Sequence, residues 1–127
     1  MRQFRLRLPL LVLLACLTGC GSNLRVSTIQ VGRSVNADNT VAGHTTTFKP
    51  DETVYVAVVI AGAGSGVVGV RWTYAGRVVG EPTKPVRGAG ATEFHLQNAG
   101  GFPPGEYSVE AFLDGQSAGT RTFRVEN

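Results

Sequence analysis

The thiols are the first groups in this sequence that could do chemistry, and the chain has two, Cys16 and Cys20. Cysteines that form a disulfide or a metal site are normally distributed through the fold that they stabilise. Here no cysteine follows Cys20, although most of the chain lies beyond it. Both thiols are therefore placed for a role at the N-terminus and not inside a folded domain.

The histidines are the next candidates for catalysis or metal binding, and the chain has two, His44 and His95. A zinc site normally needs a second histidine or a cysteine at short spacing, and neither residue has one. A serine, a histidine and an aspartate can be combined on paper, but no nucleophile elbow or similar local signature accompanies them. We therefore predict no metal, no catalytic residues and no enzymatic activity.

One glycine-rich segment, GSGVVG at 64–69, fits the G-x-G-x-x-G pattern of dinucleotide-binding loops and follows a predicted strand. In those loops a helix begins directly after the glycines, and its N-terminus holds the pyrophosphate. Residues 70–80 are instead rich in β-branched and aromatic side chains and are interrupted by glycines. The segment therefore predicts a flexible loop between strands and no nucleotide cofactor.

The formal net charge of +3 comes from three arginines at the extreme N-terminus, Arg2, Arg5 and Arg7. In the rest of the chain, the basic residues equal the nine acidic ones in number, and the two signs are interspersed. Nucleic-acid binding needs a basic stripe, and electrostatic membrane binding needs a cluster of Lys and Arg. The composition therefore argues against nucleic acid as a partner.

The N-terminal segment has the layout of a secretory signal peptide. Its arginines precede an apolar run, LPLLVLLACL at 8–17, which falls well short of the roughly 20 apolar residues that a membrane-spanning helix needs. Small residues and Cys20 follow. We expect residues 1–19 to direct export and then to be removed.

The sequence LTGC at 17–20 resembles the lipobox of bacterial lipoproteins, in which a leucine and two small residues precede the modified cysteine. The resemblance implies that the thiol of Cys20 carries a lipid and that cleavage leaves Cys20 as the new N-terminus, while Cys16 is lost. Two or more acyl chains hold a protein stably at a membrane, whereas one chain holds it only marginally. Residues 20–23 then form a short lipidated tether.

The same resemblance implies a location in the cell envelope, with the membrane as a partner through the lipid on Cys20. Gly21 follows the cysteine, whereas the familiar signal for retention at the inner membrane of Gram-negative cells is an aspartate. If the cell is Gram-negative, we therefore expect the protein at the periplasmic face of the outer membrane.

Strand signals recur through residues 24–127, separated by Gly, Pro, Asn and Asp, whereas helix signals are almost absent. Residues 53–61 are apolar on both faces and should lie in the centre of a sheet. Pro82 and Pro85 should end a strand or confine it to an edge. The other predicted strands are 24–31, 67–75, 77–81, 91–97, 105–115 and 119–126, with a type I′ turn at Asp114-Gly115. About seven strands in this order predict a single all-β sandwich.

The order of these strands resembles an immunoglobulin-like or fibronectin-type III-like sandwich over residues 24–127. Trp72 falls where such domains carry their core tryptophan, on a strand that alternates apolar and polar residues. Tyr107 looks like the tyrosine-corner residue, because it follows PPG and opens the sixth strand. The usual disulfide positions fall near Val56 or Val58 and at Val109, which implies that valines replace the bridge. The resemblance implies an architecture and no particular function.

From these features we expect a membrane-anchored, non-catalytic interaction or accessory module of the envelope, with a protein or a cell-wall polymer as its partner. Two alternatives stay open. The protein could inhibit an envelope hydrolase, or it could be a structural subunit of an envelope complex. An enzyme is the third and least favoured class.

The short tether implies that one end of the sandwich faces the membrane, together with the loops 62–66, 87–91 and 114–119. The opposite end gathers the stretch 36–50, the turn from Tyr74 to Arg77 and the loop around Phe102. We expect a partner to bind there, with Phe102, Tyr74 and Arg77 as candidate binding residues. Phe102 is either an exposed anchor for the partner or a ring that folds back and plugs the sandwich beside Tyr107.

Overall fold

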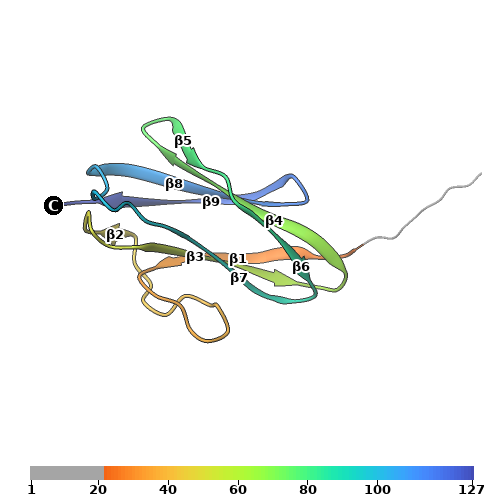
Figure 1. Cartoon of the computed structure of the whole chain (residues 1–127). Coiled ribbons are helices and arrows are strands. Elements are labelled where there is room, and N and C mark those ends of the chain that lie inside the picture. Colours follow the sequence, from red (N-terminus) through yellow and green to blue (C-terminus); the bar gives the residue numbers. More distant parts are fainter. Residues whose placement is uncertain (1–21) are drawn as a thin grey trace, which may run out of the picture.

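The computed structural model describes residues 22–127, which form two β-sheets packed face to face (Figure 1). The three-stranded sheet has the order β1-β3-β7, and the six-stranded sheet has the order β2-β9-β8-β4-β5, with β6 also paired to β4. The strands are β1 (Arg25–Gly32), β2 (Thr47–Phe48), β3 (Val54–Ala61), β4 (Ser65–Tyr74), β5 (Arg77–Gly80), β6 (Thr83–Arg87), β7 (Gly90–Leu96), β8 (Gly105–Leu113) and β9 (Gln116–Val125). All strand pairs are antiparallel except β2 with β9. This part of the chain contains no helix that is long and apolar enough to cross a membrane.

Every strand that the sequence predicts is present, and two further strands were missed. β2 is only two residues long, and it pairs with the end of β9. β6 contains Pro85, which lies opposite Val67 of β4, and β6 pairs with no other strand. The prolines therefore keep this segment at a sheet edge, as expected, but they do not prevent it from being a strand.

The prediction of a flexible loop at 64–69 is wrong, because Ser65 to Gly69 belong to β4 and pair with Arg87 to Thr83 of β6. The consecutive valines in this segment favour extended backbone. Gly69 is needed for close packing and not for mobility, since a Cβ there would lie 3.0 Å from Thr83 Cγ2. The bend falls earlier, at Gly62 and Gly64, which both have positive φ.

The core lies between the two sheets and is built mainly from alternate residues of β1, β3, β4, β8 and β9. β3 is the central strand of its sheet, as its apolar sequence predicts. Trp72 of β4 is 1 % exposed, and the valines at the expected disulfide positions are fully buried. These are Val56, Val58 and Val109. The sandwich is therefore filled by aliphatic and aromatic packing where a bridge would otherwise lie.

Tyr107 forms the tyrosine corner that the sequence predicts. Its hydroxyl donates a hydrogen bond of 2.7 Å to the carbonyl oxygen of Pro103, four residues upstream. Its ring stacks on Phe123 at a centroid distance of 5.2 Å. The residue therefore joins the loop before β8 to the aromatic core.

Replacing Tyr107 by phenylalanine should lower the free energy of unfolding by about 1 kcal/mol, because it removes one hydrogen bond and keeps the ring packing. Urea-induced unfolding measures the loss. The matched control is Tyr74→Phe, which removes a longer bond of 3.1 Å to Pro104 from a half-buried side chain and should cost less. Equal or reversed losses in the two variants would contradict the assignment of Tyr107 as the corner.

The two ends of the sandwich carry different loops and turns. Asn23 contacts the loop after β3 through two hydrogen bonds, from its N–H to the Ala63 carbonyl at 3.1 Å and from the Ala63 N–H to Asn23 Oδ1 at 2.8 Å. The loop 88–89 and the turn at 114–115 lie at this same end, which we call the proximal end (Figure 1). The expected grouping of these three connections is confirmed. The turn at 75–76, the loop 97–104 and the C-terminus lie opposite, at the distal end (Figure 1).

The predicted signal peptide 1–19, the predicted lipid-attachment residue Cys20 and Gly21 fall outside the residues that the structure describes. Their predicted roles stay predictions. The remainder of the expected tether, Ser22 and Asn23, is followed by Leu24 and then by β1.

Candidate partner-binding site

A groove of about 280 Å³ opens at the distal end, between the edge of the larger sheet and the edge of the smaller one. Its lining comes from β4, β5, the end of β7, the loop after it and the start of β8. The lining residues are Tyr74, Arg77, Val79, Leu96, Gln97, Asn98, Phe102, Pro103 and Tyr107. We call this the distal groove. The structure thus brings the three predicted binding residues, Phe102, Tyr74 and Arg77, into one site.

Phe102 is not the exposed anchor that one reading of the sequence proposed. The side chain is 5 % exposed, and its ring meets Tyr107 edge to face at 5.8 Å. Gly101, with a φ of 89°, turns the backbone, and the Phe102 N–H then donates to the Pro50 carbonyl at 2.8 Å. The ring therefore plugs the end of the sandwich and forms part of the floor of the groove.

The two tyrosines make this floor rigid. Tyr74 and Tyr107 stack at a centroid distance of 4.4 Å, and their hydroxyls donate to the carbonyls of Pro104 and Pro103. Burial raises the pKa of Tyr107, and the neighbouring Tyr74 adds to this rise. Tyr107 therefore keeps its proton, and its role as a donor, throughout the neutral pH range.

Arg77 is the charged residue of the distal groove. Several other cations of the domain form ion pairs, such as Arg33 with Glu52 and Arg71 with Glu81. Arg77 is exposed and forms no ion pair with any residue between Ser22 and Asn127. The groove therefore offers one accessible positive charge beside an aromatic floor.

Val79, Leu96 and the pair Gln97-Asn98 belong to the site but were missed from the sequence. A β-bulge in β5 leaves Val79 without an opposite residue on β4, since Thr73 pairs with Val78 and Trp72 pairs with Gly80. Bulges commonly redirect a side chain in this way. Leu96 ends β7 of the other sheet, and Gln97 and Asn98 begin the loop after it, so only the packing of the two sheets could place them here.

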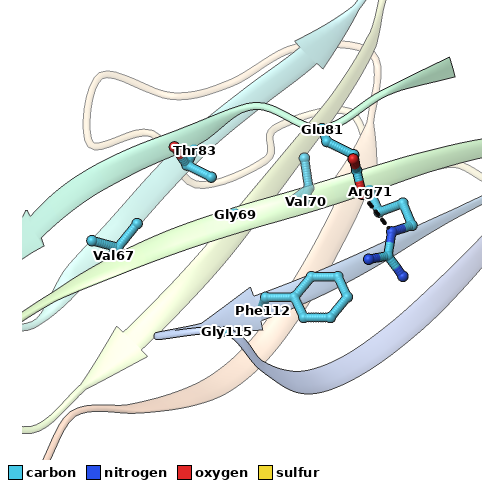
Figure 2. A pocket seen from close by; sticks show the side chains of 8 residues that line it. All are labelled: Val67, Gly69, Val70, Arg71, Glu81, Thr83, Phe112 and Gly115. Carbon is cyan, nitrogen blue, oxygen red and sulfur yellow. Dashed lines mark hydrogen bonds and ion pairs between the residues drawn. The ribbon is translucent and has the colours of Figure 1, made fainter. Parts of the chain in front are cut away.

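A second concave surface lies on the outer face of the larger sheet, over β4, β6 and β8 (Figure 2). Phe112 packs beside Gly69, and the Arg71 guanidinium lies 4.8 Å from its ring centre. Arg71 Nε donates to Glu81 Oε2 at 2.7 Å, the contact drawn in Figure 2. Because its only lining cation is already paired, this surface offers less than the distal groove for recognising a charged partner.

The histidines are placed as surface groups. His95 Nδ1 lies 2.6 Å from Glu93 Oε2, and Lys84 Nζ lies 3.6 Å from the other oxygen of Glu93. His44 is exposed and belongs to a separate part of the chain, in a bridge opposite Gly32. Residues 22–127 contain no group of three or more His, Cys, Asp and Glu close enough to hold a metal ion.

No protein-family model and no curated protein sequence matches this chain. Its fold is similar to that of an immunoglobulin-like protein from Pseudomonas aeruginosa, with a TM-score of 0.60 and 14 % identity over 85 % of this chain and 100 % of the other. The domain is an immunoglobulin-like sandwich. At this identity the likeness concerns the fold alone.

Similar immunoglobulin-like folds also occur inside longer proteins. A β-glucosidase from Listeria innocua matches with a TM-score of 0.51 and 13 % identity over 84 % of this chain, which spans 16 % of the enzyme. An alkylpurine DNA glycosylase from Pseudomonas fluorescens matches with a TM-score of 0.50 and 11 % identity over 84 % of this chain, which spans 31 % of that protein. In both, the matching part is a minor portion of the whole chain.

Proposed function

We propose that this protein is a lipid-anchored, non-catalytic module of the cell envelope that holds a protein or cell-wall partner at its distal end. The observation that carries the proposal is the placement of two features at opposite ends. Asn23, at the start of the domain, is hydrogen-bonded to the loop after β3 at the proximal end. The residues that line the distal groove lie at the far end of the sandwich.

The tether supports this orientation. Ser22 is two positions after Cys20, and an extended chain covers about 7 Å over that distance. Ser22 packs against Gly64, where an added Cβ would lie within 2.8 Å of the Ser22 Cα. A lipid on Cys20 would therefore keep the proximal loops close to the membrane and direct the distal groove away from it.

The form of the distal groove supports binding in preference to catalysis. Its lining is aromatic and aliphatic, with two amides and one arginine, and it contains no histidine, carboxylate or hydroxyl nucleophile apart from the two bonded tyrosines. Similar sandwiches form minor portions of two larger enzymes, which fits an accessory role. Inhibition of an envelope hydrolase and membership in an envelope complex remain the alternatives to this role.

Replacing Cys20 by alanine should abolish attachment of a fatty acid and cleavage of the signal, because the thiol is the proposed attachment point. Metabolic labelling with a radioactive fatty acid, followed by a gel shift, measures both. The matched control is Cys16→Ala, which should retain the label because Cys16 lies in the segment that is removed. Label on the Cys20 variant would refute the anchor.

A photo-crosslinking residue placed at Val79, in the distal groove, tests the partner-binding part of the proposal in intact cells. The control carries the same residue at Ala89, in the exposed loop at the proximal end. We expect a discrete crosslinked species from position 79 and lipid or no product from position 89. A stoichiometric complex would indicate a structural subunit, and a captured hydrolase would indicate an inhibitor. Equal crosslinking from both ends would contradict binding at the distal end.

A further inference from the structure

We propose that the distal groove binds an extended, acidic peptide segment of a partner protein, which adds to the edge of β5 and places a carboxylate on Arg77. This inference rests on the proposed function, since it names the chemistry of the partner at the same site.

The first argument is the exposure of β5. Three large apolar side chains are markedly exposed between Ser22 and Asn127, and two of them, Val78 and Val79, are neighbours on this strand, at 53 % and 47 %. Side chains on successive residues of a strand point to opposite faces, and the bulge directs Val79 into the groove. Neither face of β5 is therefore covered by the domain itself.

The second argument is the backbone of the same strand. β5 pairs with β4 and is the last strand of its path in the larger sheet. Tyr74 and Arg77 close a two-residue turn, with positive φ at Ala75 and Gly76. In such a hairpin the closing pair directs its backbone groups inward, so the N–H and C=O of Val78 point away from β4. An edge of this kind is completed by the backbone of another strand.

The third argument is charge. Arg77 is the sole charged residue among those that line the groove, and it has no acidic neighbour within ion-pair distance in residues 22–127. The rest of the lining supplies apolar surface from Val79 and Leu96 and a rigid floor from the stacked tyrosines. A matching ligand therefore carries one carboxylate close to an apolar side chain.

These features together favour a peptide over a saccharide. Aromatic rings and amides can bind a sugar, but a sugar does not complete the hydrogen bonds of a strand edge or cover two exposed valines. A peptide in extended conformation does both, and its side chains alternate so that one enters the groove while the next remains outside. The groove volume of about 280 Å³ suits a single side chain and not a drug-sized ligand.

The test uses the full chain, kept soluble in detergent and applied to an array of random heptapeptides. Peptides that bind are resynthesised with a fluorophore and measured in solution by anisotropy. We expect the binders to be enriched in Asp or Glu next to a β-branched or aromatic residue. Replacing that acid by its amide in the peptide should weaken binding about tenfold, as the loss of a charged hydrogen bond does.

The protein variants separate the role of Arg77 from general effects of charge. Arg77→Gln should weaken binding of the acidic peptides about tenfold and should not change that of their amide versions. The control is Arg87→Gln, at the proximal end of β6, which removes another exposed arginine that forms no ion pair with residues 22–127. Arg87→Gln should leave binding unchanged, and thermal unfolding should show that both variants remain folded.

Hydrogen exchange supplies a readout that a simple ionic contact would not affect. If the peptide adds to the sheet, exchange of the Val78 amide should slow in the complex. Four results would each overturn the proposal. The first two are binding peptides that contain no acid and equal weakening by Arg77→Gln and Arg87→Gln. The other two are unchanged exchange at Val78 and binding of chito-oligosaccharides in place of peptides. None of these results depends on lipidation, so the anchor at Cys20 is tested separately.

Discussion

Replacing Trp72 by alanine should lower the free energy of unfolding by about 3–5 kcal/mol, the range for truncation of large core side chains. The side chain is 1 % exposed, and its ring contacts Phe123 edge to face at 6.1 Å. Its removal leaves a cavity between the two sheets that the neighbouring rings can fill only in part. Total stability of small domains is about 5–15 kcal/mol, so the variant should unfold at a much lower urea concentration.

A second substitution at the same position separates packing from hydrogen bonding. The indole Nε1 of Trp72 is buried and has no hydrogen-bond partner among residues 22–127. Trp72→Phe removes this unpaired donor and keeps most of the apolar volume, so it should cost less than half as much as Trp72→Ala. A loss under about 1 kcal/mol for Trp72→Ala would instead mean that the ring contributes little to the core.

Trp72 also illustrates which parts of this fold can be read from the sequence. Its strand alternates apolar and polar residues, and the period of two alone identifies the buried face. The prediction for Tyr107 came from the resemblance to immunoglobulin-like sandwiches, because this residue follows PPG and opens the sixth predicted strand. Features that depend on neighbours in sequence were thus predicted correctly.

Features that depend on contacts between residues distant in the sequence were not predicted correctly. Pro85 lacks a backbone N–H, and local signals therefore argue against a strand at 83–87, yet an edge position makes that donor unnecessary. The glycines at 64–69 suggested a loop because the residues that they pack against lie elsewhere in the chain, such as Asp114 beside Gly66 and Thr83 beside Gly69. The distal groove has two walls from different sheets, and Val79 enters it only because of a bulge opposite Trp72 and Thr73.

The exposure of Phe102 was the point at which sequence reasoning left two alternatives open. Apolar rings in loops between glycines and prolines occur both as exposed anchors and as plugs. The choice depends on the Pro50 carbonyl, which accepts the Phe102 N–H from a distant part of the chain, and on the ring of Tyr107. The structure selects the plug, and our proposal therefore assigns partner binding in the groove to Arg77 and the exposed edge of β5.

Replacing Phe102 by alanine should therefore lower the free energy of unfolding by about 3 kcal/mol. This value is at the lower end of the range for buried phenylalanines, because the site lies at the end of the sandwich, where the loop 97–104 can relax. The loss should appear in urea unfolding and as a decrease of roughly 10–20 °C in the thermal midpoint. Peptide binding should also weaken, since the ring forms part of the groove floor.

The matched control is Phe112→Ala, which removes the same side chain from the outer face of the larger sheet. Phe112 is only half-buried and lies against the Arg71 guanidinium, so its removal should cost about 1 kcal/mol or less. The difference between the two losses of unfolding free energy measures the contribution of the buried Phe102 ring and not the general effect of losing a phenyl ring. If Phe102→Ala instead kept full stability and lost only binding, the ring would act as an exposed anchor, and the packing of Phe102 against Tyr107 would not be what closes the distal end.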